Sequence, residues 1–279
     1  MMLEIFGYDF MLRAFIVGIL ISIIAPCIGV IIVLKRLSMI GDSLSHNSLA
    51  GVAAGLIAGI NPIVGATVFS IAAAFSIEKV RKSFPRYSEI ALAIIMSTGI
   101  GLAGILSGYI KNSANFTSFL FGSIVAISDF ELYLVVGLSA IVMIALLLLY
   151  KELFYITFDE EAAKLAGIPV KSINFIFTLL TAITISVSAR IVGTLVISSM
   201  MVLPVAAAMQ MAKSYRQTVV YSVVFALVAT VSGLFLSYYA NLKPGGTIVL
   251  VSVFMLSVGL LFNNFLRKAI LQTAAKVDS

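Results

Sequence analysis

Charged residues, cysteine and histidine are all scarce in this chain of 279 residues. Only 11% of the residues are charged whereas 61% are hydrophobic, and the mean hydropathy is +1.16. This composition excludes a soluble globular protein and indicates one that crosses a membrane several times. The single cysteine, Cys27, excludes an internal disulfide and a cluster of metal-binding thiolates, so we expect it to pack as a small apolar side chain.

Catalytic motifs are also absent from the sequence. No glycine is followed by lysine, so the phosphate-binding pattern G-x-x-x-x-G-K-[ST] cannot occur. The patterns G-x-S-x-G and H-E-x-x-H are missing as well. The net charge of +6 comes from basic residues between the apolar segments, which does not indicate a nucleic-acid-binding surface. We therefore expect neither an enzyme nor a nucleic-acid-binding protein, and any ATP-driven step must use a separate chain.

Apolar segments long enough to cross a bilayer, about 20 residues each, occupy most of the chain. The run 43–77 has no charge apart from that of His46, is too long for one helix and breaks naturally at Asn61-Pro62. Residues 1–279 are therefore expected to form one all-α domain, a polytopic transmembrane helical bundle of about nine spans (8–9) in which small residues allow close packing. The expected spans are 14–34, two short helices within 43–77, 90–110, 132–150, 172–189, 191–212, 218–242 and 245–266.

The distribution of basic residues predicts the orientation of the bundle. The loop with Lys79, Arg81, Lys82 and Arg86 is strongly basic and is therefore placed in the cytoplasm. Counting spans alternately from it puts 14 of the 18 basic residues on the cytoplasmic side. The exceptions are Arg13, Lys111, Arg190 and Lys243. The sequence thus predicts a multi-pass protein of the cytoplasmic membrane with its C-terminus in the cytoplasm.

The only histidine, His46, lies four residues after Asp42 in the segment G-D-S-L-S-H-N-S-L-A-G-V-A-A-G. On a helix this spacing puts the two side chains on one face, with β-carbons about 5–6 Å apart. A carboxylate oxygen and an imidazole nitrogen in that arrangement can bind one divalent cation. Ionisable groups are costly inside a membrane and usually have a function there. Asp42 and His46 are therefore candidate metal ligands.

Other roles for this pair remain open at this point. Asp42 could cap the N-terminus of the helix, and His46 could be a core histidine whose nitrogens bond to a neighbour. A secondary cation carrier could use Asp42 as a proton relay. A permease for a metal chelate or a vitamin would need a wide cavity, and it offers no reason for an acid and a histidine one turn apart.

The longest charged segment, 151–171, has the pattern of a cytoplasmic loop that contains a short helix. Acidic residues stand at the N-terminal end of that helix, Gly167 follows as a stop, and Pro169 lies beyond it. The order E-A-A-x-x-x-G from Glu161 to Gly167 is similar to the signature with which permease subunits of ABC importers dock onto an ATPase subunit. The candidate coupling residues are Asp159, Glu160, Glu161, Ala162 and Gly167.

Three segments together carry a resemblance that covers nearly the whole chain. They are R-L-S-M-I-G-D-S-L-S-H-N-S-L-A-G-V-A-A-G at 36–55, F-D-E-E-A-A-K-L-A-G-I-P at 158–169 and G-T-L-V-I-S-S-M-M-V-L-P-V-A-A-A-M at 193–209. In this order and spacing the chain resembles the permease subunits of ABC importers for zinc and manganese. Segments 189–195 and 243–250 look more like zinc permeases than manganese permeases. Asn47 departs from the family, in which many relatives have a small apolar residue.

This resemblance implies a transport subunit rather than an enzyme. It implies two separate ATPase subunits, an extracytoplasmic metal-binding protein and a second permease subunit, most simply another copy of the chain. It also implies that Asp42 and His46 contact the transported ion, zinc or alternatively manganese, and that no cofactor is permanently bound. Two ligands from each of two subunits would give four, enough for a tetrahedral Zn²⁺.

Overall fold

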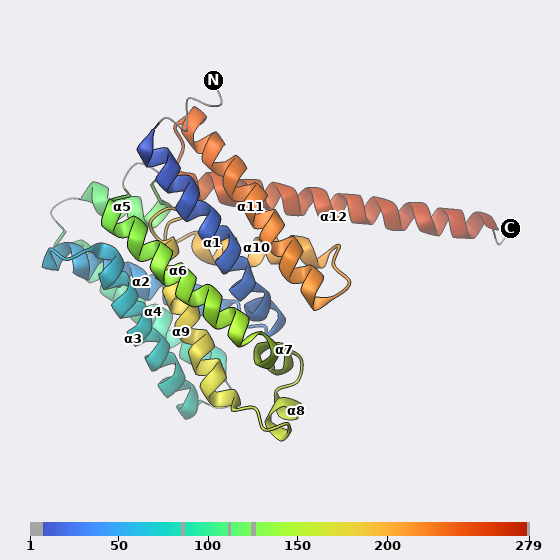
Figure 1. Cartoon of the computed structure of the whole chain (residues 1–279), viewed down its shortest axis with the longest axis horizontal. Coiled ribbons are helices and arrows are strands. Elements are labelled where there is room, and N and C mark those ends of the chain that lie inside the picture. Colours follow the sequence, from blue (N-terminus) through green and yellow to red (C-terminus); the bar gives the residue numbers. More distant parts are fainter. Residues whose placement is uncertain (1–7, 85–86, 111–112, 124–126, 278–279) are drawn as a thin grey trace.

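The structure, a computed structural model, describes residues 8–84, 87–110, 113–123 and 127–277. Within these residues every regular element is an α-helix, and the helices form one bundle (Figure 1). Arg86 and Lys111, which entered the orientation count, lie outside the described residues. The helices are α1 (Asp9–Leu34), α2 (Met39–Ala58), α3 (Pro62–Ser83), α4 (Ser88–Ser107), α5 (Ser113–Phe121), α6 (Asp129–Leu148), α7 (Tyr150–Phe158), α8 (Glu160–Leu165), α9 (Val170–Ser188), α10 (Ile197–Met209), α11 (Tyr215–Ala240) and α12 (Pro244–Val277).

The all-α transmembrane fold is confirmed, but the number of spans differs from the expected nine. Among the described residues, seven helices are long and apolar enough to cross a membrane: α1, α3, α4, α6, α9, α11 and α12. The two that fall short are α2 and α10. Helix α2 has 20 residues, but its polar side chains lower its hydropathy. Helix α10 has only 13 residues, a length of about 20 Å against a hydrocarbon core of about 30 Å.

The expected span 191–212 is wrong because the chain turns sharply before α10. Gly193 has a φ of 90°, a conformation that glycine adopts without strain. A Cβ at this residue would lie 2.4 Å from the carbonyl oxygen of Leu120, at the end of α5. The amide of Thr194 also donates a hydrogen bond to the carbonyl of Phe119 at 2.8 Å. These contacts hold the turn against α5, so the helix begins only at Ile197.

Local sequence signals do set other helix boundaries. The break at Asn61-Pro62 is confirmed, because Asn61 Oδ1 accepts a hydrogen bond from the amide of Ile63 at 2.9 Å and Pro62 is the first helical residue. Helix α6 begins before the expected position 132 because Ser128 and Glu131 form a capping box in which each side chain bonds the backbone amide of the other.

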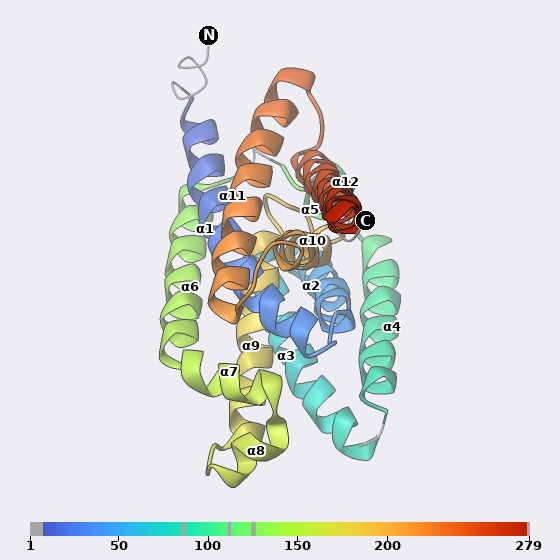
Figure 2. The same ribbon diagram turned by 90° about the vertical axis from the view of Figure 1, so that its right-hand side faces the viewer.

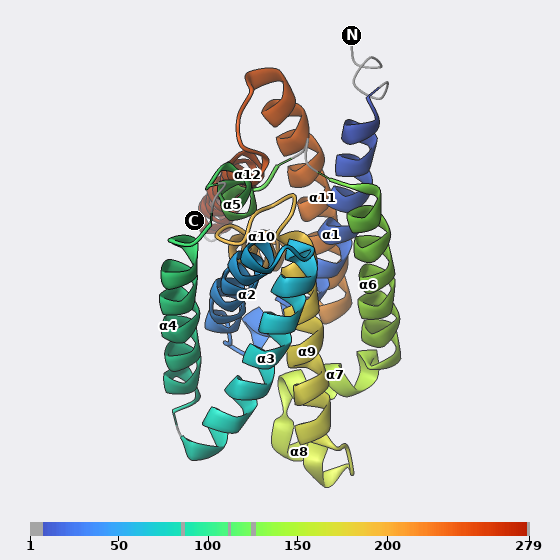
Figure 3. The same cartoon turned by 90° about the vertical axis from the view of Figure 1, so that its left-hand side faces the viewer.

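Helix α2 lies inside the bundle, between α3 and α4, and also touches α5, α9 and α10 (Figures 2 and 3). Its backbone comes into direct contact with that of α3. A Cβ at Gly51 would lie 2.3 Å from the carbonyl oxygen of Gly65, and a Cβ at Gly65 would lie 2.4 Å from that of Gly51. Small residues at both positions are therefore required, as expected for helices that pack in lipid.

Gly51→Ala should destabilise the protein by about 1–3 kcal/mol, since the added methyl group forces the α2 and α3 backbones apart. The matched control is Gly101→Ala in α4, where a Cβ meets no atom within 4 Å. Both substitutions replace a helical glycine by alanine, and this change by itself raises the free energy of unfolding by about 0.5–1 kcal/mol because alanine loses less backbone entropy on folding. The measurement is the thermal midpoint in detergent of a fluorescent-protein fusion. Equal midpoints for the two variants would contradict the close contact.

Candidate functional site

Asp42 and His46 lie one turn apart on α2, as the sequence predicted. Both side chains are half-buried, whereas Gly41, Ser43 and Ser45 around them are buried. The two residues therefore form the accessible edge of a helix whose other faces in this region are covered. Among the described residues, neither side chain has a hydrogen bond or ion pair with the protein, so their oxygen and nitrogen atoms are free to bind a ligand.

The alternative roles for the pair fit the structure less well. Helix α2 begins at Met39 and its N-cap residue is Ser38, so the interpretation of Asp42 as the N-cap is wrong. Asp42 does lie in the first turn, where the helix dipole stabilises a carboxylate. His46 is not a fully buried core residue, since its side chain is partly exposed.

Asn47 is turned away from this edge and toward α4. Its Nδ2 donates to the carbonyl oxygen of Ser43 at 2.8 Å and to that of Ile95 at 2.9 Å. A Cβ at Gly99 of α4 would lie 2.7 Å from the same nitrogen. The amide group of Asn47 therefore fastens α2 to α4, and its polarity does not belong to the edge formed by Asp42 and His46.

One copy of the chain supplies only a partial ligand set at this edge. Within the part of the chain that the structure describes, no group of three or more His, Cys, Asp or Glu side chains could hold a metal ion. Two ligands are fewer than the four of a tetrahedral zinc site. The described part of one chain therefore offers fewer ligands at this edge than a tetrahedral zinc site needs.

Helix α8 confirms the short helix expected within 151–171. The side chain of Asp159 caps it by accepting a hydrogen bond from the amide of Ala162 at 2.9 Å. The amides of Gly167 and Ile168 donate to the carbonyls of Lys164 and Ala163, both at 3.1 Å, which is the Schellman pattern of a helix end. Gly167 has a φ of 83°, as this pattern requires.

The candidate coupling residues form an exposed surface at the end of the bundle opposite the N-terminus (Figure 1). Glu160, Glu161, Ala162 and Gly167 are all exposed, and only Ala163 of α8 is buried, at 2% exposure. The sequence analysis missed Leu165, whose side chain is 91% exposed. Leu165 and the acidic residues of α8 are therefore uncovered by the rest of the described chain.

Helix α7 holds this surface in place by aromatic packing. Phe154 lies 5.1 Å from Tyr215 between ring centroids, and Phe158 lies 6.0 Å from the same ring, which stands at the start of α11. Leu153 and Ile156 on the other side of α7 are buried in the core. Helix α7, which leads directly into α8, is therefore held against α11 and the core.

A family model described as the ABC 3 transport family matches residues 7–263, almost the entire chain. The chain belongs to the ABC 3 transport family. Its exposed α8 and its polar α2 are thus features of a membrane protein from a transport family.

Relatives of this ABC 3 transport family member have names that refer to metal transport. It is 38% identical over 251 residues to a protein of Treponema pallidum named a probable metal transport system membrane protein, covering 89% of this chain and 94% of the relative. It is 33% identical to the manganese import system permease protein ScaB of Streptococcus parasanguinis, covering 88% of each. It is 28% identical to the high-affinity zinc uptake system membrane protein ZnuB of Haemophilus influenzae, covering 91% of this chain and 97% of the relative.

The three-dimensional fold also has a solved counterpart. The structure of PsaBC from Streptococcus pneumoniae in complex with Fab contains a chain that superposes with a TM-score of 0.83 at 31% identity. The match covers 93% of this chain and 95% of the other.

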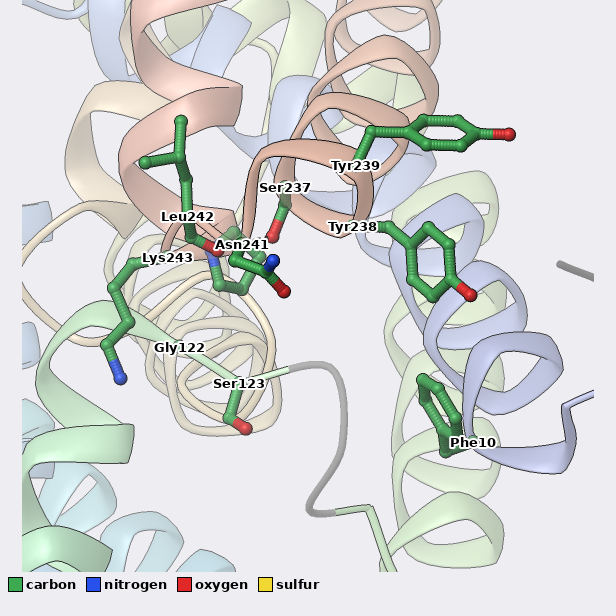
Figure 4. A pocket seen from close by; sticks show the side chains of 10 residues that line it. Phe10, Gly122, Ser123, Ser237, Tyr238, Tyr239, Asn241, Leu242 and Lys243 are labelled. Carbon is green, nitrogen blue, oxygen red and sulfur yellow. Dashed lines mark hydrogen bonds between the residues drawn. The ribbon is translucent and has the colours of Figure 1, made fainter.

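A cleft of about 590 Å³ opens beside the turn between α11 and α12, near the N-terminal end of α1 (Figure 4). Hydroxyl, amide and aromatic groups line it, together with the ammonium of Lys243. Its described lining contains no carboxylate and no imidazole. The cleft therefore lacks the ligands of a metal site, and the candidate metal ligands remain those of α2.

A buried ion pair, which the sequence analysis did not predict, lies at the same end of the helical bundle as this cleft. Arg190 Nε lies 3.2 Å from Glu131 Oε2, with the two side chains 13% and 4% exposed. The guanidinium also stands 4.6 Å from the centre of the Phe119 ring. Nearby, Arg13 pairs with Asp129 at 2.7 Å. No spacing in the sequence could reveal these pairs, because each joins residues that are far apart in the chain.

Proposed function

We propose that this chain is the permease subunit of an ATP-driven importer of divalent metal ions in the cytoplasmic membrane. The observation that carries the proposal is the accessible edge of α2, where Asp42 and His46 are the only residues between Ile40 and Ala53 that are not buried. A carboxylate and an imidazole on one helical face suit zinc and manganese. Membership of a transport family and the names of the relatives support the same function.

The transported ion passes between two permease subunits, most simply two copies of this chain. A twofold axis next to α2 brings two aspartates and two histidines together, which completes a four-ligand site. Each half of this site binds the ion weakly when the subunits separate. Incomplete coordination in one state helps release, because a transported ion must leave as well as enter.

Separate ATPase subunits drive the transport by docking on α8. The exposed side chains of Glu160, Glu161 and Leu165 lie on this helix, where a partner can reach them. In the orientation inferred from the basic residues, 151–171 and the C-terminus are cytoplasmic, whereas the cleft of Figure 4 faces the extracytoplasmic side. An extracytoplasmic metal-binding protein delivers the ion to that side.

Asp42→Asn and His46→Ala should each reduce metal uptake by at least tenfold, because the first removes the carboxylate charge at nearly constant size and the second removes the imidazole nitrogen. The matched control is Ser45→Ala on the same helix, whose hydroxyl bonds only to the carbonyl of Gly41. The measurement is uptake of zinc and of manganese by cells, normalised to the amount of folded permease. Normal uptake by His46→Leu, or loss of uptake only in proportion to lost protein, would contradict a ligand role.

The double substitution Glu161→Lys with Leu165→Asp should prevent copurification of the ATPase subunit and abolish transport. Both side chains are exposed, so the permease itself should fold normally. Glu89→Lys, the same charge reversal at an exposed site on α4, is the control. Transport at the normal rate without bound ATPase would instead indicate a secondary carrier.

The ion proposed as the substrate is zinc, with manganese as the second candidate. Zinc is favoured by a four-ligand set of carboxylates and imidazoles, which suits tetrahedral coordination. Manganese is favoured by the 33% identity to ScaB, which exceeds the 28% identity to ZnuB. Growth of a deletion strain under chelation, with each metal added back separately, distinguishes them. We expect trace zinc to restore growth. Growth restored by trace manganese alone would instead identify manganese as the substrate.

A further inference from the structure

An apolar groove lies over α1 on the surface of the bundle, between α6 and α11. Helices α6 and α11 both pack against α1, and Figure 1 shows α1 between them. Among the described residues, however, α6 and α11 make little contact with each other. The groove between them has a volume of about 120 Å³. Its lining includes Cys27 and Ile31 of α1, Leu147 of α6 and Val219 of α11.

The surroundings of this groove are lipid rather than water. Helices α1, α6 and α11 are all long and apolar enough to cross a membrane, and Leu147 at the mouth of the groove is 67% exposed. A water molecule held in the groove would need about two to four polar partners, which the mainly apolar lining does not provide. An acyl chain, by contrast, makes the dispersion contacts that an empty groove forfeits.

Two tyrosines close one end of the groove. Tyr150 is the first residue of α7 and Tyr215 is the first residue of α11, and both line the groove. Their ring centroids are 5.7 Å apart. Since α6 ends and α11 begins here, this end lies at a surface of the membrane, where tyrosine is enriched. In the orientation inferred from the basic residues, that surface is the cytoplasmic one.

Basic side chains flank the tyrosines at this end. Lys151 is next to one tyrosine in the chain, Lys213 and Arg216 are within two residues of the other, and all three are exposed. The ion pairs among the described residues are made by other basic side chains. Segments 150–153 and 213–219 contain these three positive charges against the one carboxylate of Glu152, which leaves a net charge of +2. The phosphate of a lipid headgroup can supply the missing negative charge.

We propose that this groove binds one anionic phospholipid of the cytoplasmic leaflet, with an acyl chain over Cys27 and Ile31 and the phosphate beside Lys151 and Arg216. The apolar groove leads directly to the basic end, as the acyl chain of a phospholipid leads to its headgroup. The bound lipid fills the space between α6 and α11 and contacts the start of α7. This site depends on the transmembrane fold alone and not on the metal that the protein transports.

The test measures the lipid retained per chain by the purified full-length protein, using native mass spectrometry after reconstitution with phosphatidylglycerol or phosphatidylcholine of identical acyl chains. We expect the wild type to retain at least fivefold more phosphatidylglycerol than phosphatidylcholine. Lys151→Gln with Arg216→Gln should reduce this preference to less than twofold, because the headgroup loses its counter-charges while the groove is unchanged. The matched control is Lys171→Gln with Lys243→Gln, which removes two charges from exposed sites at the start of α9 and before α12 and should keep the preference.

A second pair of variants tests the groove itself. Val219→Phe fills the groove with an aromatic ring and should reduce the retention of both lipids at least fivefold. Val220→Phe adds the same ring at the next residue of α11, which is 50% exposed, and should retain both lipids as the wild type does.

Three results would overturn the inference. Equal retention of the two lipids by the wild type would exclude an anionic headgroup, and equal retention by Val219→Phe and Val220→Phe would exclude the groove as the site. Absence of retained lipid from the wild type, together with a dimer that Val219→Phe dissociates, would assign the groove to a contact between two chains. The glutamine variants change only exposed side chains, so they test the proposal even if Val219→Phe does not fold.

Discussion

Burial of the polar helix α2 within the bundle is the constraint on which the rest of this structure depends. A helix that carries an aspartate, a histidine, an asparagine and several serines is poorly solvated by lipid, so other helices must enclose it. Glycine contacts allow α3 to approach its backbone directly, and Asn47 fastens it to α4. Between Ile40 and Ala53 the enclosure leaves only Asp42 and His46 partly exposed, and His46 is the only histidine of the chain.

The two ends of the bundle are built differently, and the difference suits a protein that works across a membrane. At the N-terminal end, ion pairs and glycine contacts tie α1, α6, the turn before α10 and α5 together. At the other end, α8 projects with most of its surface uncovered, supported from behind by the aromatic packing of α7 on α11. One end is thus stabilised internally, whereas α8 at the other end is largely uncovered by the rest of the described chain.

Much of the fold and of the candidate site could be predicted from local patterns. Hydropathy located the long helices, Asn61-Pro62 divided one long apolar run, and Asp159 and Gly167 delimited α8, because caps and stops act over a few residues. The i, i+4 spacing of Asp42 and His46 placed them on one face. The turn at Gly193 could not be predicted, since its contacts come from α5, more than 70 residues earlier. Apolar composition continues through that turn, so hydropathy indicated a helix where tertiary contacts prevent one.

The sequence by itself determined that the chain is an all-α membrane protein without a nucleotide-binding motif, and it determined which side chains could bind a metal. These properties depend on residue type and short-range spacing, which the chain carries in any conformation. Only the tertiary structure decided that the edge with Asp42 and His46 stays accessible while Asn47 is used in packing, that Leu165 is uncovered, and that α6 and α11 leave an apolar groove over α1. Exposure and long-range pairing depend on how separate helices pack against one another, and no local pattern encodes that packing.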